Sequence, residues 1–238
     1  MKNGYLLIDK PKDWTSHDVV AYIRKIYKRY LRHNDSPKPK RPKVGHAGTL
    51  DPFATGLLIV ALGRDATKKI DQFKDMKKTY LANIKLGAYS DTQDSTGQII
   101  FNNISKEHRP GPKHVEEVIK NFIGPQEQIP PMYSAKKIKG QKLYELARQG
   151  KTIDRKPVKI NIYNLKIINY KWPNLVVEVD CSRGTYIRTL AHDIGKKLEV
   201  SGYCEKLRRT KIGNFKVENA IKPKLVKIDN IERLIHNL

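Results

Sequence analysis

A carboxylate in an unusual backbone is the feature of this sequence with the clearest chemical potential. Asp51 lies in a stretch of 13 residues, 44–56, that contains three glycines and one proline. Glycine permits backbone angles closed to other residues, and Pro52 disfavours helical geometry at Asp51, so the chain is predicted to turn sharply here. Asp51 therefore either caps the turn with its own side chain or presents an acid to a cleft.

The segments on either side of this stretch predict the elements that must position it. Residues 5–8 are predicted to form a strand, 57–62 a buried strand and 66–73 a short helix. Residues 17–31 predict an amphipathic helix with Ser16 as its N-cap. Its apolar face would carry Val19, Val20, Ile23, Tyr27 and Leu31.

The rest of the chain mixes strands and helices. Strands are predicted at 79–86, 158–170, 175–181 and 207–215, with Tyr80, Ala82, Ile84 and Leu86 on one side of the first. A turn is predicted at 91–97, and helices at 113–123, 141–149, 185–198 and 228–238. Without a regular strand-helix alternation or a repeat, this order favours an α+β fold.

The charge balance predicts a polyanionic partner. The chain has 47 Lys and Arg against 24 Asp and Glu, which gives +23 on 238 residues and an isoelectric point near 9.9. Such an excess raises affinity for phosphates without specifying a fold. Residues 32–43 hold three prolines and five Lys or Arg. This basic excursion is predicted to be irregular and exposed, either contacting the polyanion or simply solvated.

Composition also bounds the compartment. Cys181 and Cys204 are too few for a metal constellation and are predicted to be reduced thiols, with zinc ligation or a disulfide as the alternatives. A hydrophobic content of 39% supports a core without disulfides. The sequence shows neither a long apolar run nor a targeting segment at its start, so a cytoplasmic protein is expected.

Several motifs together resemble the TruB family of tRNA pseudouridine synthases. Residues 45–56, GHAGTLDPFATG, are similar to the family's catalytic loop, and Lys78-Thr79-Tyr80, residues 130–136 and residues 184–188 resemble further motifs in the family's order. The resemblance runs from about Gly4 to about Phe215. It implies a pseudouridine synthase fold, with a mixed, mainly antiparallel central sheet flanked by helices. It also implies a single catalytic domain over 1–238 and an RNA-gripping insertion at about 124–157.

The implied activity is the isomerisation of uridine to pseudouridine at position 55 in the T arm of tRNA. The base must first be flipped out of the RNA stack, detached at N1, rotated and rejoined through C5. Asp51 is the implied catalytic residue. It could attack C6, attack C1′ to form an acylal, or remove the 2′ proton to give a glycal-like species. No cofactor is expected, because the isomerisation is redox neutral.

The resemblance also implies roles for four further residues. Arg188 would pair with Asp51 and keep its carboxylate ionised. Tyr80 would stack on the flipped uracil, and His46 would fill the space that the base leaves. Leu207 would line the pocket. Each residue also has a structural alternative. Arg188 could be an exposed helix cation and Tyr80 a core tyrosine, while His46 could stabilise the loop and Leu207 could be a core leucine.

Basic residues beyond this set are predicted to hold RNA through its phosphates, with the aromatic Tyr144 among them. Lys10, in the motif Asp9-Lys10-Pro11, is a weaker candidate with a structural alternative. The predicted RNA-binding residues are Lys10, Lys136, Lys137, Lys142, Arg148, Arg208 and Arg209.

Two rival functions stay open. One is a non-catalytic RNA-binding protein, such as a tRNA-folding chaperone, in which Asp51 is only a turn residue. The other is a guide-dependent modifier of ribosomal RNA, which the long segment 130–150 disfavours. A monomer without guide RNA is expected. No PUA-like domain is expected after Phe215, and the basic excursion could replace part of the RNA contact that such a domain makes.

Overall fold

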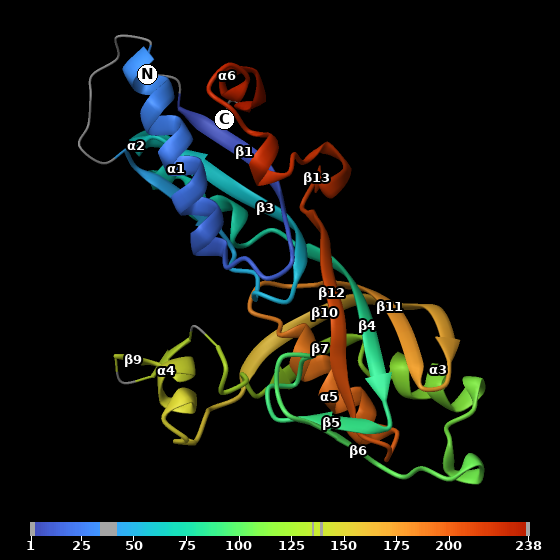
Figure 1. Ribbon diagram of the computed structural model, residues 1–238. Helices are drawn as coiled ribbons and strands as arrows, with labels where there is room; N and C mark the ends of the chain where they lie inside the picture. The colour runs from blue at the N-terminus through green and yellow to red at the C-terminus, as the bar shows by residue number, and fades with distance from the viewer. Residues whose placement is uncertain (1–2, 34–41, 135, 139, 237–238) are drawn as a thin grey trace. The chain divides into compact units, whose positions relative to one another are not determined.

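The chain forms two compact units in the computed structural model, which describes residues 3–33, 42–134, 136–138 and 140–236 (Figure 1). The first unit comprises Met1–Thr79 and Arg208–Leu238, and the second comprises Tyr80–Leu207. Strands β4 (Lys78–Leu86) and β12 (Gly202–Ile212) each belong partly to both. The basic excursion lies mostly outside the described residues. The expectation of a single catalytic domain stays a prediction.

Strand β3 (Thr55–Leu62) is the centre of the first unit. It pairs antiparallel with β1 (Gly4–Lys10) along the whole length of β1, and antiparallel with the short β2 (Val44–Ala47). At its start β3 also pairs parallel with β12, through Arg208 opposite Thr55 and Arg209 opposite Gly56. The smaller strand β13 (Phe215–Lys216) pairs with β12.

Both faces of β3 are buried over residues 57–62, which form an unbroken apolar run. Leu58, Val60 and Leu62 pack with helix α1 (Ser16–His33), whereas Leu57, Ile59 and Ala61 face a second cluster with Phe73. Alternate side chains of a strand point to opposite faces, so one strand serves two cores. The second cluster is closed by α2 (Arg64–Lys68), the 3₁₀ turn η1 (Ile70–Phe73) and the 3₁₀ turn η3 (Val217–Asn219).

Helix α1 confirms the predicted apolar face, but its N-cap is Thr15 rather than Ser16. The Thr15 hydroxyl accepts the backbone N–H of Asp18 at 3.0 Å, and the Asp18 carboxylate accepts the backbone N–H of Thr15 at 2.8 Å. This reciprocal pair is a capping box. The hydroxyl of Ser16 is therefore available for a contact outside the helix.

The predicted helix over 228–238 does not form in its described part, residues 228–236. Helix α6 (Ile231–Leu234) is a single turn that follows the 3₁₀ turn η4 (Pro223–Leu225). His236 then pairs with Tyr5, through backbone hydrogen bonds of 2.9 and 2.8 Å. The open edge of β1 thus recruits the chain as an extended segment, which the local sequence does not signal. Similarly, the predicted helix 66–73 divides into α2 and η1 at Lys69, whose ψ is 2°.

The second unit is built on a sheet in which β4 lies between β12 and β11 (Asn174–Cys181), followed by β10 and β7. Strand β10 (Val158–Lys171) pairs antiparallel with both β11 and β7 (Gly124–Gln128). Helix α3 (Pro112–Lys120) packs on β10 and on helix α5 (Ile187–Lys197). The mixture of strands and helices confirms the predicted α+β class. Cys181 and Cys204 are both buried.

Smaller elements complete the second unit. Strands β5 (Ala88–Ser90) and β6 (Ile99–Phe101) form a hairpin around the predicted turn at 91–97. The turn η2 (Lys106–His108) follows it. Strands β8 (Lys137–Ile138) and β9 (Gln141–Lys142) precede helix α4 (Leu143–Arg148). Among the helices of the described residues, none is long and apolar enough to span a membrane.

Close packing of α5 on the start of β12 gives a test of this arrangement. A Cβ at Gly195 would lie 2.2 Å from the backbone nitrogen of Gly202. Gly195→Ala is therefore expected to lower the free energy of unfolding by about 1 to 3 kcal/mol, measured by chemical denaturation. Gly111→Ala is the control, because nothing lies within 4 Å of the added methyl, and it should stay within about 1 kcal/mol. Equal effects of the two variants would contradict the packing.

Candidate active site

Asp51 lies half-buried in the loop between β2 and β3, which we call the Asp51 loop and define as residues 48–56. The backbone turns at Gly48, whose φ is +75°, and again where the N–H of Ala54 donates to the carbonyl of Asp51 at 3.1 Å. The predicted sharp turn is confirmed. Several contacts hold this loop in one conformation.

Ser16 holds the residue directly before Asp51. Its Oγ accepts the backbone N–H of Leu50 at 2.9 Å and donates to the carbonyl of Leu50 at 3.2 Å. Both Ser16 and Leu50 are buried, so neither backbone group has water as an alternative partner. One hydroxyl therefore fixes the peptide groups on both sides of Leu50.

Lys10 holds the residue directly after Asp51. Its ammonium donates to the carbonyls of Pro52, Pro11 and Trp14, at 3.2, 2.9 and 2.6 Å, and the Pro52 carbonyl also accepts the N–H of Asp13. Burial lowers the pKa of Lys10 to about 8, and the negative charge of Asp51 opposes this shift. Lys10 thus remains an ammonium at pH 7. Its side chain has no exposed surface, which favours the structural alternative over direct RNA contact.

Arg209 holds both ends of the loop. Its Nη2 donates to the carbonyl of Gly48 at 3.0 Å and its Nε to the carbonyl of Leu57 at 2.8 Å. A Cβ at Gly56 would lie 2.3 Å from the Arg209 carbonyl oxygen, so only glycine fits there. Arg209 is 1% exposed, and the expectation that it contacts RNA phosphates disagrees with this placement. Sequence reasoning missed its structural role, because nothing local marks an arginine as buried.

Arg208 is more accessible than Arg209. Its guanidinium makes two hydrogen bonds of 2.9 Å to the two carboxylate oxygens of Asp9. The Arg208 side chain is 38% exposed and that of Asp9 is 19% exposed. Arg208 therefore keeps a surface on which a phosphate could lie, beside an ion pair that fixes its direction.

His46 lies on β2, two residues before the Asp51 loop, and pairs with Val60 of β3. Its half-buried ring contacts the ring of His17 edge-on, with 5.6 Å between centroids. Burial lowers the pKa of His46 to about 4, and the neighbouring His17, Arg209 and Lys74 add to the shift. The ring is therefore neutral at pH 7, which suits stacking on bases better than pairing with phosphate.

In the second unit, Arg188 is almost fully buried at the start of α5. Its Nη1 donates to the carbonyl of Thr92 at 2.9 Å and lies 3.5 Å from Oδ2 of Asp94, and its Nη2 donates to the carbonyl of Tyr133 at 2.7 Å. The alternative of an exposed helix cation is wrong. The other oxygen of Asp94 accepts hydrogen bonds from Thr92 and from Thr96. Sequence reasoning treated Asp94 only as part of a turn.

Tyr80 and Leu207 lie where β4 and β12 enter the second unit. Tyr80 is half-buried, and Leu207 is 7% exposed. One residue before Tyr80, the carbonyl of Thr79 accepts the Thr210 hydroxyl at 3.3 Å. Tyr80 directly follows Thr79, and Leu207 lies three residues before Thr210. This hydrogen bond between β4 and β12 therefore helps to position both candidates.

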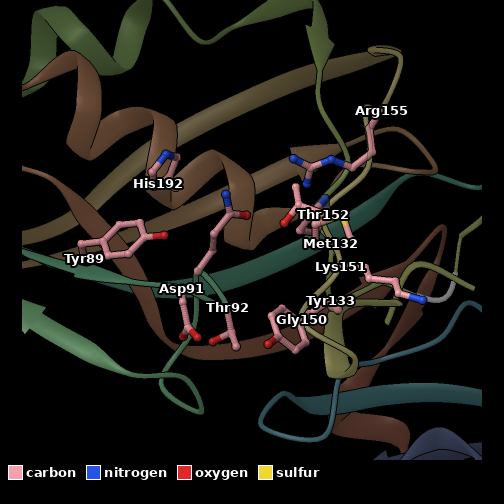
Figure 2. A pocket seen from close by; sticks show the side chains of 13 residues that line it. Tyr89, Asp91, Thr92, Met132, Tyr133, Gly150, Lys151, Thr152, Arg155 and His192 are labelled. Atoms are coloured by element: carbon pink, nitrogen blue, oxygen red, sulfur yellow. The ribbon is translucent and has the colours of Figure 1, made fainter. Parts of the chain in front are cut away.

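Figure 2 shows a cavity of about 400 Å³ in the second unit, between the 91–97 turn, α5 and the segment 131–155. The carbonyl partners of Arg188 belong to two of its lining residues, Thr92 and Tyr133. The Arg155 guanidinium points into the cavity, whereas the Lys151 ammonium points away (Figure 2). Aromatic and cationic groups therefore meet beside Arg188.

The predicted RNA-gripping segment is only partly described. Lys136 is half-buried, and the side chains of Lys137, Lys142 and Arg148 lie outside the described residues. The segment is anchored at its start by Gln128, whose side chain exchanges two hydrogen bonds, of 3.0 and 2.8 Å, with the backbone of Tyr186. Tyr186, the partner of Gln128, lies two residues before Arg188. This anchor ties the segment to the start of α5.

Comparison with known proteins gives the family. The sequence model described as "TruB family pseudouridylate synthase (N terminal domain)" matches residues 34–187, and "tRNA pseudouridylate synthase B C-terminal domain" matches residues 188–236. The chain belongs to the TruB family of pseudouridylate synthases. The tRNA pseudouridine synthase B of Caldicellulosiruptor saccharolyticus is 44% identical over 99% of this chain and 77% of that protein. The corresponding protein of Protochlamydia amoebophila is 41% identical over 98% of this chain and 84% of its own length.

Solved structures of related fold include larger assemblies. A chain of a Cbf5-Nop10-Gar1 complex matches with a TM-score of 0.67 at 28% identity, over 96% of this chain and 54% of that one. A chain of an H/ACA RNP bound to a substrate RNA containing 2'-deoxyuridine matches with a TM-score of 0.63 at 26% identity. The match covers 98% of this chain and 56% of that one. This chain spans about half the length of those two. The pseudouridine synthase fold implied by the sequence motifs is confirmed.

The Ser16 contact predicts a measurable cost in the TruB-family loop. Ser16→Ala leaves the buried N–H and carbonyl of Leu50 without their partner, and is expected to lower the free energy of unfolding by about 1 to 3 kcal/mol. Amide hydrogen exchange at Leu50 should accelerate. Thr49→Ala removes an exposed hydroxyl from the same loop and should stay within about 0.5 kcal/mol. Unchanged protection of the Leu50 amide in Ser16→Ala would contradict the role of the Ser16 hydroxyl in holding the backbone of Leu50.

Burial of His46 predicts a pH dependence of known sign. The pKa of His46 is near 6.5 in the unfolded chain and about 4 in the folded protein. Between these values the unfolded state therefore binds more protons than the folded state. Stability contributed by His46 should therefore fall as the pH falls through this window. Urea denaturation of the native protein and of His46→Gln, at pH 7 and at pH 4.5, measures it. The advantage of the native protein should be larger at pH 7, and an equal advantage at both would contradict the neutral ring.

Proposed function

We propose that this protein binds tRNA and isomerises uridine to pseudouridine at position 55 in the T arm, with Asp51 as the catalytic carboxylate. Membership of the TruB family supports the reaction, since its relatives are tRNA pseudouridine synthases. The observation that carries the role of Asp51 is the backbone around it. Gly48, Leu50 and Pro52 are each held by a different buried side chain.

A fixed backbone suits each chemical route open to Asp51. Attack on C6, attack on C1′ and removal of the 2′ proton all require a carboxylate oxygen close to one atom of the nucleotide. A loop that moved by an ångström would lose much of that advantage. The reaction exchanges one bond to uracil for another without oxidation or reduction, so it requires no redox cofactor.

The remaining site residues keep the roles that the family resemblance implies, as predictions. Arg188 would stabilise the ionised form of Asp51, and its own position is fixed by Asp94 and two carbonyls. Tyr80 would stack on the flipped uracil, and Leu207 would line the pocket. A neutral His46 would occupy the space that the base vacates.

The expected partner is tRNA alone. A net charge of +23 favours binding of its backbone, and the cavity beside Arg188 supplies aromatic and cationic groups for unpaired bases. Action as a monomer, independence from a guide RNA and a cytoplasmic location remain part of this proposal. The match to a chain of an H/ACA RNP keeps a guide-dependent enzyme as the second candidate.

Replacement of the catalytic carboxylate gives the decisive test. Asp51→Asn is expected to reduce pseudouridine formation by roughly 10⁴-fold or more while tRNA binding changes little, since the fold and the basic surface are kept. Carbodiimide-dependent reverse-transcription stops on an unmodified tRNA transcript locate the product. A stop at position 55 should appear with the native protein only.

The matched control is Asp229→Asn, which removes an exposed carboxylate from the same unit and should retain full activity. Tight tRNA binding without any stop, in the native protein as well, would favour the chaperone function. Modification that depends on an added guide RNA would favour the second candidate.

A further inference from the structure

A second cavity, of about 520 Å³, lies in the first unit and has no role in the proposed chemistry. It is bounded by the end of β1, the start of β3, Arg208 and the η4 segment. The described residues that line it include Asp9, Trp14, Arg208, Lys222, Lys224 and Leu225. We call it the Trp14 pocket.

The charges of the Trp14 pocket favour an anion. Lys222 and Lys224 are exposed at its rim, and Arg208 adds a third accessible cation. Asp9 is the sole carboxylate among the lining residues, and both of its oxygens are engaged by Arg208. The two lysines are therefore not neutralised by the pocket itself, and a phosphate at the rim would meet a positive potential.

The apolar part of the Trp14 pocket favours a ring. Trp14 is half-buried, its indole contacts the Tyr22 ring edge-on at 5.7 Å, and its carbonyl is held by Lys10. Leu225 is 55% exposed and adds apolar surface to the lining of the pocket. A held aromatic ring next to cations is the composition with which proteins bind unpaired nucleotides, by stacking and by phosphate contact.

The pocket shares its wall with the Asp51 loop. Thr55 belongs to that loop, and Lys10 both lines the pocket and donates to the Pro52 carbonyl. We propose that the Trp14 pocket binds an unpaired nucleotide of the same RNA substrate, with its base on the Trp14 indole and its phosphate at Lys222 and Lys224. This inference rests on the proposed function, since it requires an RNA bound at Asp51.

Fluorescence of Trp14 tests the stacking directly. The chain has two tryptophans, so Trp172→Phe leaves Trp14 as the only indole. In that background, addition of a tRNA transcript is expected to quench the emission, while pseudouridine formation continues. Continued modification without quenching would overturn the pocket and leave the proposed function intact. Quenching without any modification would support the pocket and count against the proposed function.

Charge variants test the phosphate contact. The double variant Lys222→Gln/Lys224→Gln is expected to lower the magnitude of the salt slope of tRNA binding by about 0.7 to 0.9, from the one phosphate contact that the two lysines share. Lys211→Gln/Lys216→Gln is the matched control, with the same charge change at two exposed lysines of the same unit that do not line the pocket. Equal slopes for both double variants would mean that the pocket lysines act only through the net charge, against the proposal.

Substitution of the ring separates stacking from packing. Trp14→Ala is expected to weaken tRNA binding by about 5- to 150-fold, and Trp14→Phe should restore most of it, because any aromatic face stacks on a base. Uridine monophosphate, added alone at the concentration of tRNA that quenches Trp14, is expected to leave the fluorescence unchanged. Equal quenching by the mononucleotide would assign the pocket to a free nucleotide and overturn the RNA contact.

Discussion

The position of Asp51 depends on buried hydrogen bonds to the peptide groups beside it, and the first unit is arranged to supply them. Arg209 donates to the carbonyl of Gly48, and Lys10 donates to the carbonyl of Pro52. Ser16 bonds to both the N–H and the carbonyl of Leu50. A loop of this kind exposes backbone groups that water would otherwise satisfy in many conformations. When protein side chains satisfy them in a dry environment, one conformation is selected.

These clamps come from elements far apart in the chain. Lys10 ends β1, Ser16 begins α1, and Arg209 lies on β12 where it pairs with β3. The double-sided core on β3 fixes those elements relative to one another, so packing of ordinary apolar residues determines the geometry of the loop. The capping box of Thr15 and Asp18 contributes indirectly, because it satisfies the helix start and leaves Ser16 for Leu50.

The large positive charge serves two purposes that composition alone does not separate. Lys10 and Arg209 are buried, and they donate to carbonyls within the protein. Arg188 is likewise buried in the second unit, against Asp94 and two carbonyls. Other cations, such as Lys222 and Lys224, remain exposed and available to phosphate. Burying a cation costs free energy unless its donors are satisfied, which explains why all three of these side chains donate to backbone carbonyls.

The sequence by itself determined the α+β class, the apolar face of α1, the buried strand β3 and the turning loop around Asp51, because these follow from periodicity and from the local chemistry of glycine and proline. The motifs that resemble the TruB family indicated the type of reaction. Tertiary structure decided the burial of Arg209 and Lys10, the role of Ser16, the partner of Asp94 and the extended end of the chain at His236. Each of these is a contact between residues distant in sequence, and no local pattern records which buried donor will meet which carbonyl.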